Sequence, residues 1–237
     1  MSYLKKFCVL GLVFSLSPAW ANDAGDLIFS GDHPRRARVE LLYENVERRI
    51  DITSENPDLR RTFDADVFAL RIQSAVTPTA RLDFDIGAMS AGGGNNQLMG
   101  GVGLRFLAFE EGAWRGGTFA QVRYTEDLRD RFDLRDAENQ DARFDLVEGD
   151  AGFLISYHFP VAGQFHITPY GGPVASVLRL SGRTGEGETR ERFRARQDQI
   201  LGVVAGVGFQ FADATGLRIE FRYFDEFSVS AAAALTF

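Results

Sequence analysis

Apolar and polar residues alternate along most of this chain, in runs of about ten residues separated by turn-forming residues. In residues 81–88, for example, Leu82 and Phe84 alternate with Asp83 and Asp85. Since successive side chains of a strand point to opposite faces, each run predicts a strand with one apolar and one polar face. The predicted strands are residues 36–47, 63–76, 80–90, 98–109, 116–126, 144–159, 164–180, 199–211, 216–224 and 228–237.

The connections between these runs alternate in length. Short links, such as residues 77–79 and 212–215, alternate with longer polar links at 48–62, 126–143 and 181–198. A membrane barrel has short turns at one end and long loops at the other, whereas a soluble β-sandwich has no reason to sort its loops. The sequence therefore predicts an all-β, antiparallel transmembrane β-barrel of about ten strands, with eight as the alternative.

One predicted strand is less regular than the rest. Within residues 164–180, Pro169 and Pro173 each lack a backbone donor, and Gly171 and Gly172 lie between them. Because a proline removes a hydrogen bond from the strand ladder, we expect a bulge or a shift of register in this segment.

The N-terminus carries the pattern of a cleaved export signal. Lys5 and Lys6 precede a short apolar stretch, and the segment ends on Ala19-Trp20-Ala21, which has the small residues that a signal peptidase requires. The stretch is too short for a transmembrane helix. We expect residues 1–21 to be a signal peptide, 22–35 a periplasmic tail and 36–237 the barrel.

The C-terminal strand ends on an aromatic residue, and every second residue before it is apolar. This arrangement resembles the assembly signal at the end of outer-membrane barrels, although the edge strand of a soluble sandwich shows similar alternation. The residues that carry it are Phe227, Val229, Ala231, Ala233, Leu235 and Phe237.

Together, the export signal, the terminal aromatic and the alternating strands resemble the small outer-membrane barrel families related to outer-membrane protein A, OmpX, OmpW and the opacity proteins. Residues 170–175, Tyr-Gly-Gly-Pro-Val-Ala, are similar to a Pro-Tyr-x-Gly-x-Gly stretch of those families, from which Pro173 departs. The resemblance implies a monomer in the bacterial outer membrane, with outer-membrane lipids, lipopolysaccharide and the barrel-assembly machinery as partners. Those families include structural, adhesive, porin-like and enzymatic members, so the fold does not fix the function.

Composition narrows the chemistry further. Cys8 is the only cysteine and lies in the predicted signal peptide, so no thiol or disulfide is expected in the mature chain. The formal net charge is −7 and becomes more negative once Lys5 and Lys6 are removed, which argues against binding nucleic acid. Every remaining cation is an arginine, which can form a planar, bidentate pair with a carboxylate.

If the apolar faces contact lipid, charges of both signs point into the barrel. A barrel of eight to ten strands is barely wider than the side chains that fill it, and buried charges must be paired. We therefore expect a charge-filled, largely closed lumen, with a narrow channel for ions or small solutes as the alternative. The predicted inward charges are Arg38, Glu40, Glu44, Arg71, Arg81, Asp83, Asp85, Arg105, Arg123, Glu148, Asp150, Arg218, Glu220 and Arg222.

Catalytic groups are sparse. Ser156 and His158 share a face, which could suggest a nucleophile and its base, but they lie near the predicted periplasmic turn with His166. Asp64 and Asp66 lie at the predicted outer rim. We expect no enzyme activity, cofactor or metal, with an enzyme acting on lipid A or peptides as the less favoured alternative.

The last long loop is rich in arginine. It places a cation at every second position, which would suit contact with lipopolysaccharide phosphates, although a solvated charged loop would have the same composition. The residues are Arg190, Arg192, Arg194 and Arg196.

Overall fold

The computed structural model describes residues 37–53, 59–92, 94–134, 137–163, 165–184, 191–211 and 215–237; the predicted signal peptide and periplasmic tail lie outside these ranges. In the described part, every regular element is a strand, and no helix there is long and apolar enough to cross a bilayer. The strands are β1 (Ala37–Thr53), β2 (Leu59–Thr77), β3 (Ala80–Ala91), β4 (Gln97–Glu111), β5 (Trp114–Leu134), β6 (Ala137–Tyr157), β7 (Phe159–Ala162), β8 (Phe165–Thr184), β9 (Glu191–Gln197), β10 (Leu201–Phe211), β11 (Thr215–Tyr223) and β12 (Phe227–Thr236).

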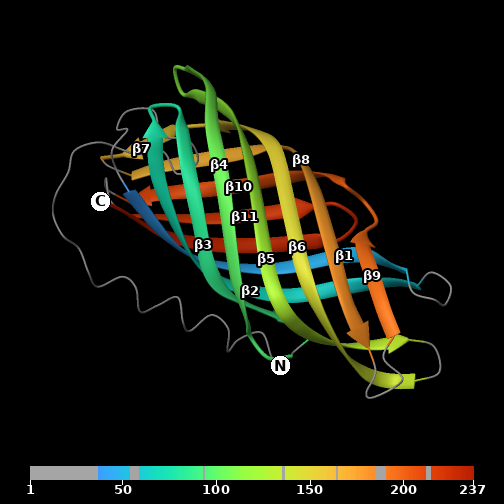
Figure 1. The fold of residues 1–237 in the computed structure, drawn as a ribbon. Helices are drawn as coiled ribbons and strands as arrows, with labels where there is room; N and C mark the ends of the chain where they lie inside the picture. The colour runs from blue at the N-terminus through green and yellow to red at the C-terminus, as the bar shows by residue number, and fades with distance from the viewer. Residues whose placement is uncertain are drawn as a thin grey trace.

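Ten of these strands close into a barrel (Figure 1). The order around the ring is β1-β2-β3-β4-β5-β6-β8-β10-β11-β12, and β12 pairs back onto β1 with Arg38 opposite Thr236. Every neighbouring pair is antiparallel. The predicted antiparallel barrel of about ten strands is confirmed.

The two ends of the barrel are built differently. At the short-turn end, β2 and β3 are joined through Pro78-Thr79 and β4 and β5 through Gly112-Ala113, where Gly112 has a φ of +59°. At the opposite, extended end, the β1–β2, β5–β6 and β8–β9 hairpins continue past the β3–β4 and β11–β12 hairpins (Figure 1). There β1 pairs directly with β9, so β9 closes the wall above the short β11–β12 hairpin.

The long polar segments predicted as loops are therefore mostly strand, and that prediction was wrong. β1 continues to Thr53, β5 and β6 reach residues 134 and 137, and β8 and β9 occupy most of 181–198. The reason is that the faces exchange character along each strand. Leu41 on β1 is 48% exposed on the outer surface, whereas Ile50 and Ile52 farther along point inward and are buried. Apolar residues face outward near the short-turn end and inward at the extended end.

A β-bulge helps this exchange on β5. The β5–β6 pairing shifts by one residue between Thr125 and Leu128, and Asp127 lies in the bulge with a φ of +51°. Before the bulge the odd-numbered Arg123 and Thr125 point inward; after it Leu128 does. The extra residue therefore replaces a charged inner face by an apolar one.

Residues 165–175 do not show the expected irregularity in their pairing with β10, although the β7–β8 register shifts between Pro160 and Ala162, opposite His166 and Phe165. β8 keeps one register against β10 from Phe165 to Ala175, with Pro169 opposite Val207 and Pro173 opposite Val203. Both prolines point outward. Gly172 sits where a Cβ would lie 1.9 Å from the carbonyl oxygen of Phe153, so only glycine allows β6 and β8 to approach this closely.

Candidate functional site

The interior of the barrel is the candidate site. Its lower part, toward the short-turn end, contains a layer of charged side chains. The structure places every predicted inward charge there, each no more than 9% exposed. Two pairs join adjacent strands. Arg71 donates from Nε and Nη2 to the two carboxylate oxygens of Asp85, each at 2.7 Å, and Arg105 Nε donates to Asp83 Oδ2 at 2.7 Å.

Other pairs in this layer cross the lumen. Arg222 on β11 donates to Asp150 on β6 at 2.8 Å, and the Tyr170 hydroxyl on β8 donates to Glu220 Oε2 on β11 at 2.6 Å. Arg222 Nε also donates to Glu220 Oε1 at 2.7 Å. Nearer the short-turn end, Glu40 accepts from Arg218 at 3.3 Å and lies 2.9 Å from Arg38. The Arg222–Asp150, Tyr170–Glu220 and Arg218–Glu40 contacts thus tie strands that are not neighbours in the ring, whereas Arg222–Glu220 and Arg38–Glu40 each lie within one strand.

Glycines on the inner face make room for these long side chains. A Cβ at Gly101 would lie 3.0 Å from Arg123 Cγ, and one at Gly206 would lie 2.4 Å from the Tyr170 ring. The space that a side chain at either glycine would need is thus occupied by a neighbouring side chain.

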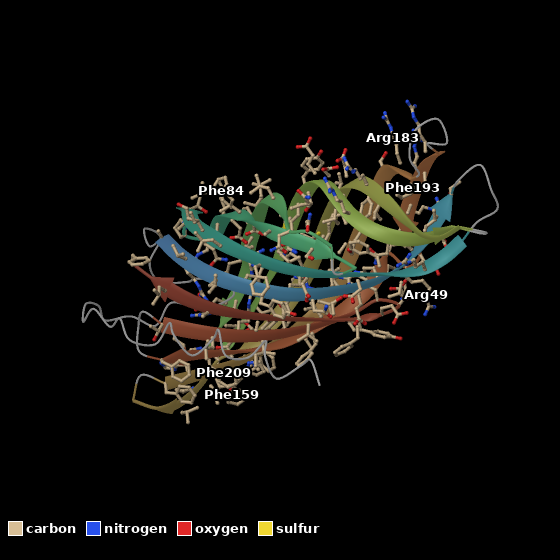
Figure 2. All side chains as sticks on the ribbon, turned by 90° about the horizontal axis from the view of Figure 1, so that it is seen from below. Arg49, Phe84, Phe159, Arg183, Phe193 and Phe209 are labelled. Carbon is tan, nitrogen blue, oxygen red and sulfur yellow. The ribbon has the colours of Figure 1, made fainter. Side chains whose placement is uncertain are left out.

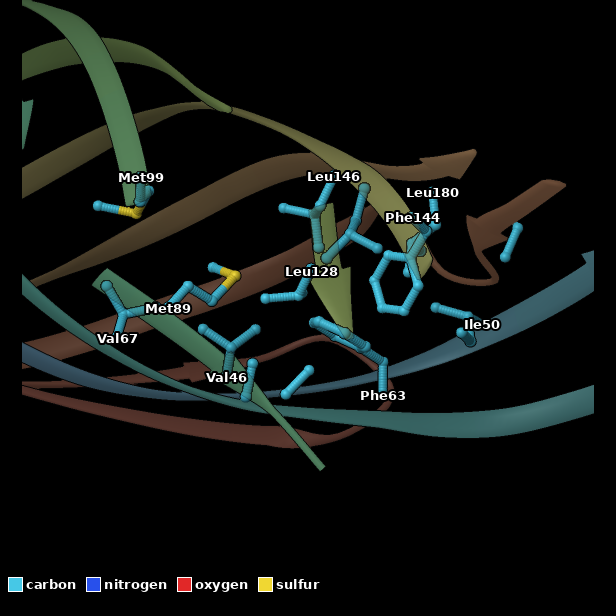
Figure 3. Packing of buried hydrophobic residues seen from close by; sticks show 14 of the residues in the cluster. Val46, Ile50, Phe63, Val67, Met89, Met99, Leu128, Phe144, Leu146 and Leu180 are labelled. Carbon is cyan, nitrogen blue, oxygen red and sulfur yellow. The ribbon is translucent and has the colours of Figure 1, made fainter. Parts of the chain in front are cut away.

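The upper part of the lumen, toward the extended end, is apolar. Its core contains Phe63 on β2, Phe144 on β6 and Phe193 on β9; Phe144 meets the other two rings edge-on, with centroids 6.3 and 6.1 Å away. Figure 3 shows Phe63 and Phe144 within this core. We call the buried cluster the apolar plug; it comprises Leu42, Val46, Ile50, Ile52, Phe63, Ala65, Val67, Ala69, Met89, Ala91, Met99, Leu128, Ala142, Phe144, Leu146, Leu178, Leu180, Phe193, Ala195 and Ala232.

Arg48 adds a further charge to the lumen, from a segment that was expected to be a loop. Its side chain is fully buried, donates to the Glu47 carbonyl at 2.8 Å and to Ser228 Oγ, and lies 4.3 Å from the centroid of the Phe224 ring. Arg48 has an even number, like the inward residues Arg38, Glu40 and Glu44, so the alternation along this strand could have identified it as an inward residue.

The outer surface carries an apolar belt around the charged layer. Phe84, Ile86, Val122 and Val203 are all about half exposed there. β10 crosses this belt with 11 residues, in line with the roughly 9–11 that a tilted strand needs to span a bilayer.

Aromatic pairs border the belt at both edges. Trp114–Tyr157 and Phe165–Phe211 lie at the short-turn end, with ring centroids 4.7 and 5.2 Å apart. Tyr43–Phe68 and Phe221–Phe227 lie at the other edge, with centroids 4.8 and 5.6 Å apart. Figure 2 shows Phe159 and Phe209 toward one end and Arg49 and Arg183 toward the other. Two aromatic girdles around an apolar band are typical of transmembrane barrels.

The residues of the predicted assembly signal lie on the outer face of β12. Phe227 and Phe237 are exposed and the alternate residues Val229, Ala231, Ala233 and Leu235 are partly exposed, while Ser228 and Ser230 point inward and are buried. The Phe237 amide donates to the Ala37 carbonyl at 2.9 Å, at the seam between the two ends of the barrel.

The candidate catalytic residues lie at two separate places in the barrel. His158 Nδ1 lies 3.3 Å from Thr168 Oγ1, its ring stacks on that of His166, and Ser156 Oγ donates to the Arg115 carbonyl at 3.5 Å. Asp64 and Asp66 lie on the outer face of β2, where Asp66 accepts from the Tyr43 hydroxyl at 2.6 Å. In the described ranges, no group of three or more His, Cys, Asp or Glu residues is arranged to hold a metal ion.

The predicted lipopolysaccharide contacts lie on an ordered strand. Arg192, Arg194 and Arg196 are exposed on the outer face of β9, whereas Arg190 lies outside the described residues.

Comparison with known proteins shows a likeness of fold. No protein family matches the sequence, and neither does any curated protein. Among solved structures, the chain is similar to the outer membrane protease OmpT from Escherichia coli, with a TM-score of 0.51 and 8% identity over 90% of this chain and 99% of that one. The autotransporter NalP translocator domain from Neisseria meningitidis matches with a TM-score of 0.42 and 11% identity, covering 85% of this chain and 88% of that one.

These solved structures are outer-membrane barrels of different function. A further one, the COG4313 outer membrane channel from Pseudomonas putida F1, matches with a TM-score of 0.38 and 14% identity over 92% of this chain and all of that one. The likeness therefore bears on the fold alone. Short turns at one end, long hairpins at the other and an apolar belt between aromatic girdles agree with it. The protein has the fold of an outer-membrane β-barrel.

Proposed function

We propose that the protein is a closed outer-membrane barrel that serves a structural or surface-interaction role and does not conduct solutes. The observation that carries this proposal is the apolar plug. Phe63, Phe144 and Phe193 come from three different strands and meet inside the barrel, each no more than 3% exposed. Water and ions would have to cross this core to pass through the lumen, and an apolar constriction opposes their entry.

The charged layer supports a closed lumen from the periplasmic side. Contacts such as Arg222–Asp150 and Tyr170–Glu220 span the interior between strands that are not neighbours. An ion would have to break several charge-assisted hydrogen bonds to pass, and each broken pair would leave a buried charge without a partner.

One observation favours the alternative of a narrow channel. Several buried polar atoms have no hydrogen-bond partner among the described residues. They are the carboxylate oxygens Glu44 Oε1, Glu148 Oε1 and Asp150 Oδ1 and the donors Nε and Nη2 of Arg48. Buried polar atoms of this kind are typically satisfied by water. Water at this level would give a hydrated chamber beneath the plug, and the chamber would conduct only if the plug opened.

Single-channel recording tests the proposal. Wild-type protein refolded into a planar bilayer should give no steady conductance. A second protein with Phe63→Ser and Phe144→Ser should admit ions, because hydroxyl groups allow the constriction to be wetted. The control, Val147→Ser, alters an outward residue next to the plug. Steady, well-resolved conductance of the wild type would refute the closed barrel and establish the channel.

A further inference from the structure

An ordered array of arginines covers one side of the extracellular extension. It lies on the outer face of three neighbouring strands, β6, β8 and β9, and every side chain in it is exposed. We call it the arginine surface; it comprises Arg143, Arg179, Arg183, Arg192, Arg194 and Arg196.

Strand register places these like charges directly opposite one another. Arg183 on β8 lies opposite Arg143 on β6 and opposite Arg192 on β9, and Arg179 lies opposite Arg196. Like charges at directly opposed positions of an antiparallel pair destabilise the sheet. The arrangement therefore calls for a source of negative charge.

Carboxylates of the described part supply only some of that charge: Asp51 on β1 lies opposite Arg196, and Asp145 lies on the same outer face of β6 as Arg143. Elsewhere at this end, Arg49 pairs with Glu226 at 2.8 Å and Arg129 lies 3.6 Å from Asp127. Within the described ranges, no carboxylate comes within ion-pair distance of the six arginines of the arginine surface. Their guanidinium groups thus remain available to an external anion.

The arginine surface adjoins the lipid-facing belt. Val177, which is 39% exposed, precedes Arg179 by two residues on the same face of β8, and the exposed Ile200 and Leu201 follow β9. Its lower edge therefore lies at the level of the outer-leaflet headgroups, and its upper part extends beyond them. The outer face of β1 and β2 differs in sign, since it carries Glu47, Asp64 and Asp66 at the corresponding edge of the belt.

We propose that the arginine surface binds the phosphate groups of lipopolysaccharide in the outer leaflet. Guanidinium groups form bidentate, charge-assisted hydrogen bonds with phosphate oxygens, and cations at every second residue of adjacent strands can contact several phosphates of one molecule. A lipid-linked phosphate is favoured over a soluble polyanion because its acyl chains would pack on the apolar belt directly below. This inference deepens the surface-interaction part of the proposed function and does not depend on whether the lumen conducts.

Titration with defined lipids tests it. Refolded protein in detergent micelles is titrated with lipid A that carries both phosphates and with the dephosphorylated form. Wild-type protein should bind the phosphorylated lipid more tightly. The triple variant Arg179→Gln, Arg194→Gln, Arg196→Gln should bind it at least about tenfold more weakly while retaining the affinity for the dephosphorylated form. The matched control, Arg49→Gln with Arg129→Gln, removes two arginines that have carboxylate partners and should stay within about twofold of wild type.

Each other outcome refutes the proposal. Equal affinity of wild type for both lipids would mean that acyl chains alone are recognised. Equal losses in the triple variant and the control would indicate a general charge effect. Tighter binding of a soluble polysulfate than of lipid A would assign the surface to a soluble partner. Heat-modifiable migration of each variant verifies that it is folded, and single-channel recording of the same samples reports separately on the closed lumen.

Discussion

Arg123 Nη1 on β5 donates a 2.6 Å hydrogen bond to Glu44 Oε2 on β1, across the lumen of the barrel. Three strands separate β1 from β5 around the ring. The same guanidinium lies 3.5 Å from Asp85 and 3.4 Å from Glu148, so one arginine neutralises carboxylates from three other strands. Through this one side chain, carboxylates of β1, β3 and β6 are connected to β5.

Replacing Arg123 with Ala should therefore destabilise the barrel strongly. Removing one partner of a buried ion pair costs about 3–5 kcal/mol, because the remaining charges lose their compensation. Urea unfolding of the refolded protein in lipid vesicles measures the change. Arg49→Ala, which breaks the half-exposed pair with Glu226, is the control and should cost no more than about 1 kcal/mol. Equal effects of the two variants would show that the charged layer is as well solvated as the surface.

Truncating Phe144 to Ala should loosen the apolar plug. The ring contacts Phe63 and Phe193 edge-on, and its loss from a packed core should cost about 3–5 kcal/mol. Because the plug joins the extended hairpins, limited proteolysis should cut the extracellular strands before the belt. Val147→Ala alters the adjacent outward residue and should leave the cleavage pattern unchanged. Identical protease resistance of both variants would contradict the role of the plug.

The backbone conformation of Asp127 in the bulge should determine which substitutions the position tolerates. Its φ of +51° is a left-handed conformation, which costs a non-glycine residue about 1–2 kcal/mol. Asp127→Gly should leave the unfolding midpoint unchanged or raise it, whereas the β-branched Asp127→Val should lower it. A midpoint that falls in the glycine variant and not in the valine variant would mean that the bulge does not require this conformation.

Removing the hydroxyl of Tyr170 isolates one cross-lumen hydrogen bond. Tyr170→Phe keeps the ring that packs beside Gly206 but removes the donor to Glu220, and a hydrogen bond to a charged group is worth about 1.5–3 kcal/mol. Denaturant unfolding should detect a loss of this size. Tyr223→Phe, on the exposed outer face of β11, serves as the control and should change the midpoint little. A loss in the control as large as that in Tyr170→Phe would remove the evidence for a buried bond.

Replacing Phe237 with Asp should impair assembly into the outer membrane. Phe237 is exposed at the barrel seam, where its amide bonds to Ala37, and a carboxylate there would lie at the edge of the lipid-facing belt. The measurement is the yield of heat-modifiable, protease-resistant barrel in the outer-membrane fraction. The control, Thr236→Ser, keeps the terminal aromatic. Normal yield of the aspartate variant would show that assembly does not depend on the C-terminal residue.

Alternation along the chain predicted the belt strands well because one physical rule governs them. Where Phe84 and Ile86 face lipid, Asp83 and Asp85 must face inward, and the structure places them so. The short turns were also predicted correctly, from the short links between the alternating runs. Most neighbours in the ring are then consecutive strands, and the pairing of β12 with β1 closes it.

The half toward the extended end could not be predicted from the same rule. There the solvent lies outside and the apolar plug inside, so Phe193 and Ala195 alternate with arginines in a segment that was interpreted as a charged loop. The one-residue bulge at Asp127 also breaks the alternation on β5. Pairs across the lumen, such as Arg222–Asp150, depend on the curvature of the closed barrel and leave no mark on local sequence.

The exchange of faces has a consequence for the membrane in which the protein can reside. On β6, Val147 is the last apolar residue on the outer face among the described side chains and Leu146 the first of the plug on the inner face, with Asp145 immediately beyond. A thicker hydrocarbon layer would bury Asp145 in lipid, and a thinner one would expose Val147 to water. Shifting the barrel along the membrane normal would relieve either mismatch at this edge only by creating a similar one at the other edge. Each ångström of mismatch costs only a fraction of a kcal/mol, but the cost accumulates around ten strands. The height of the apolar belt thus favours one hydrocarbon thickness, and the protein should partition toward membranes of that thickness.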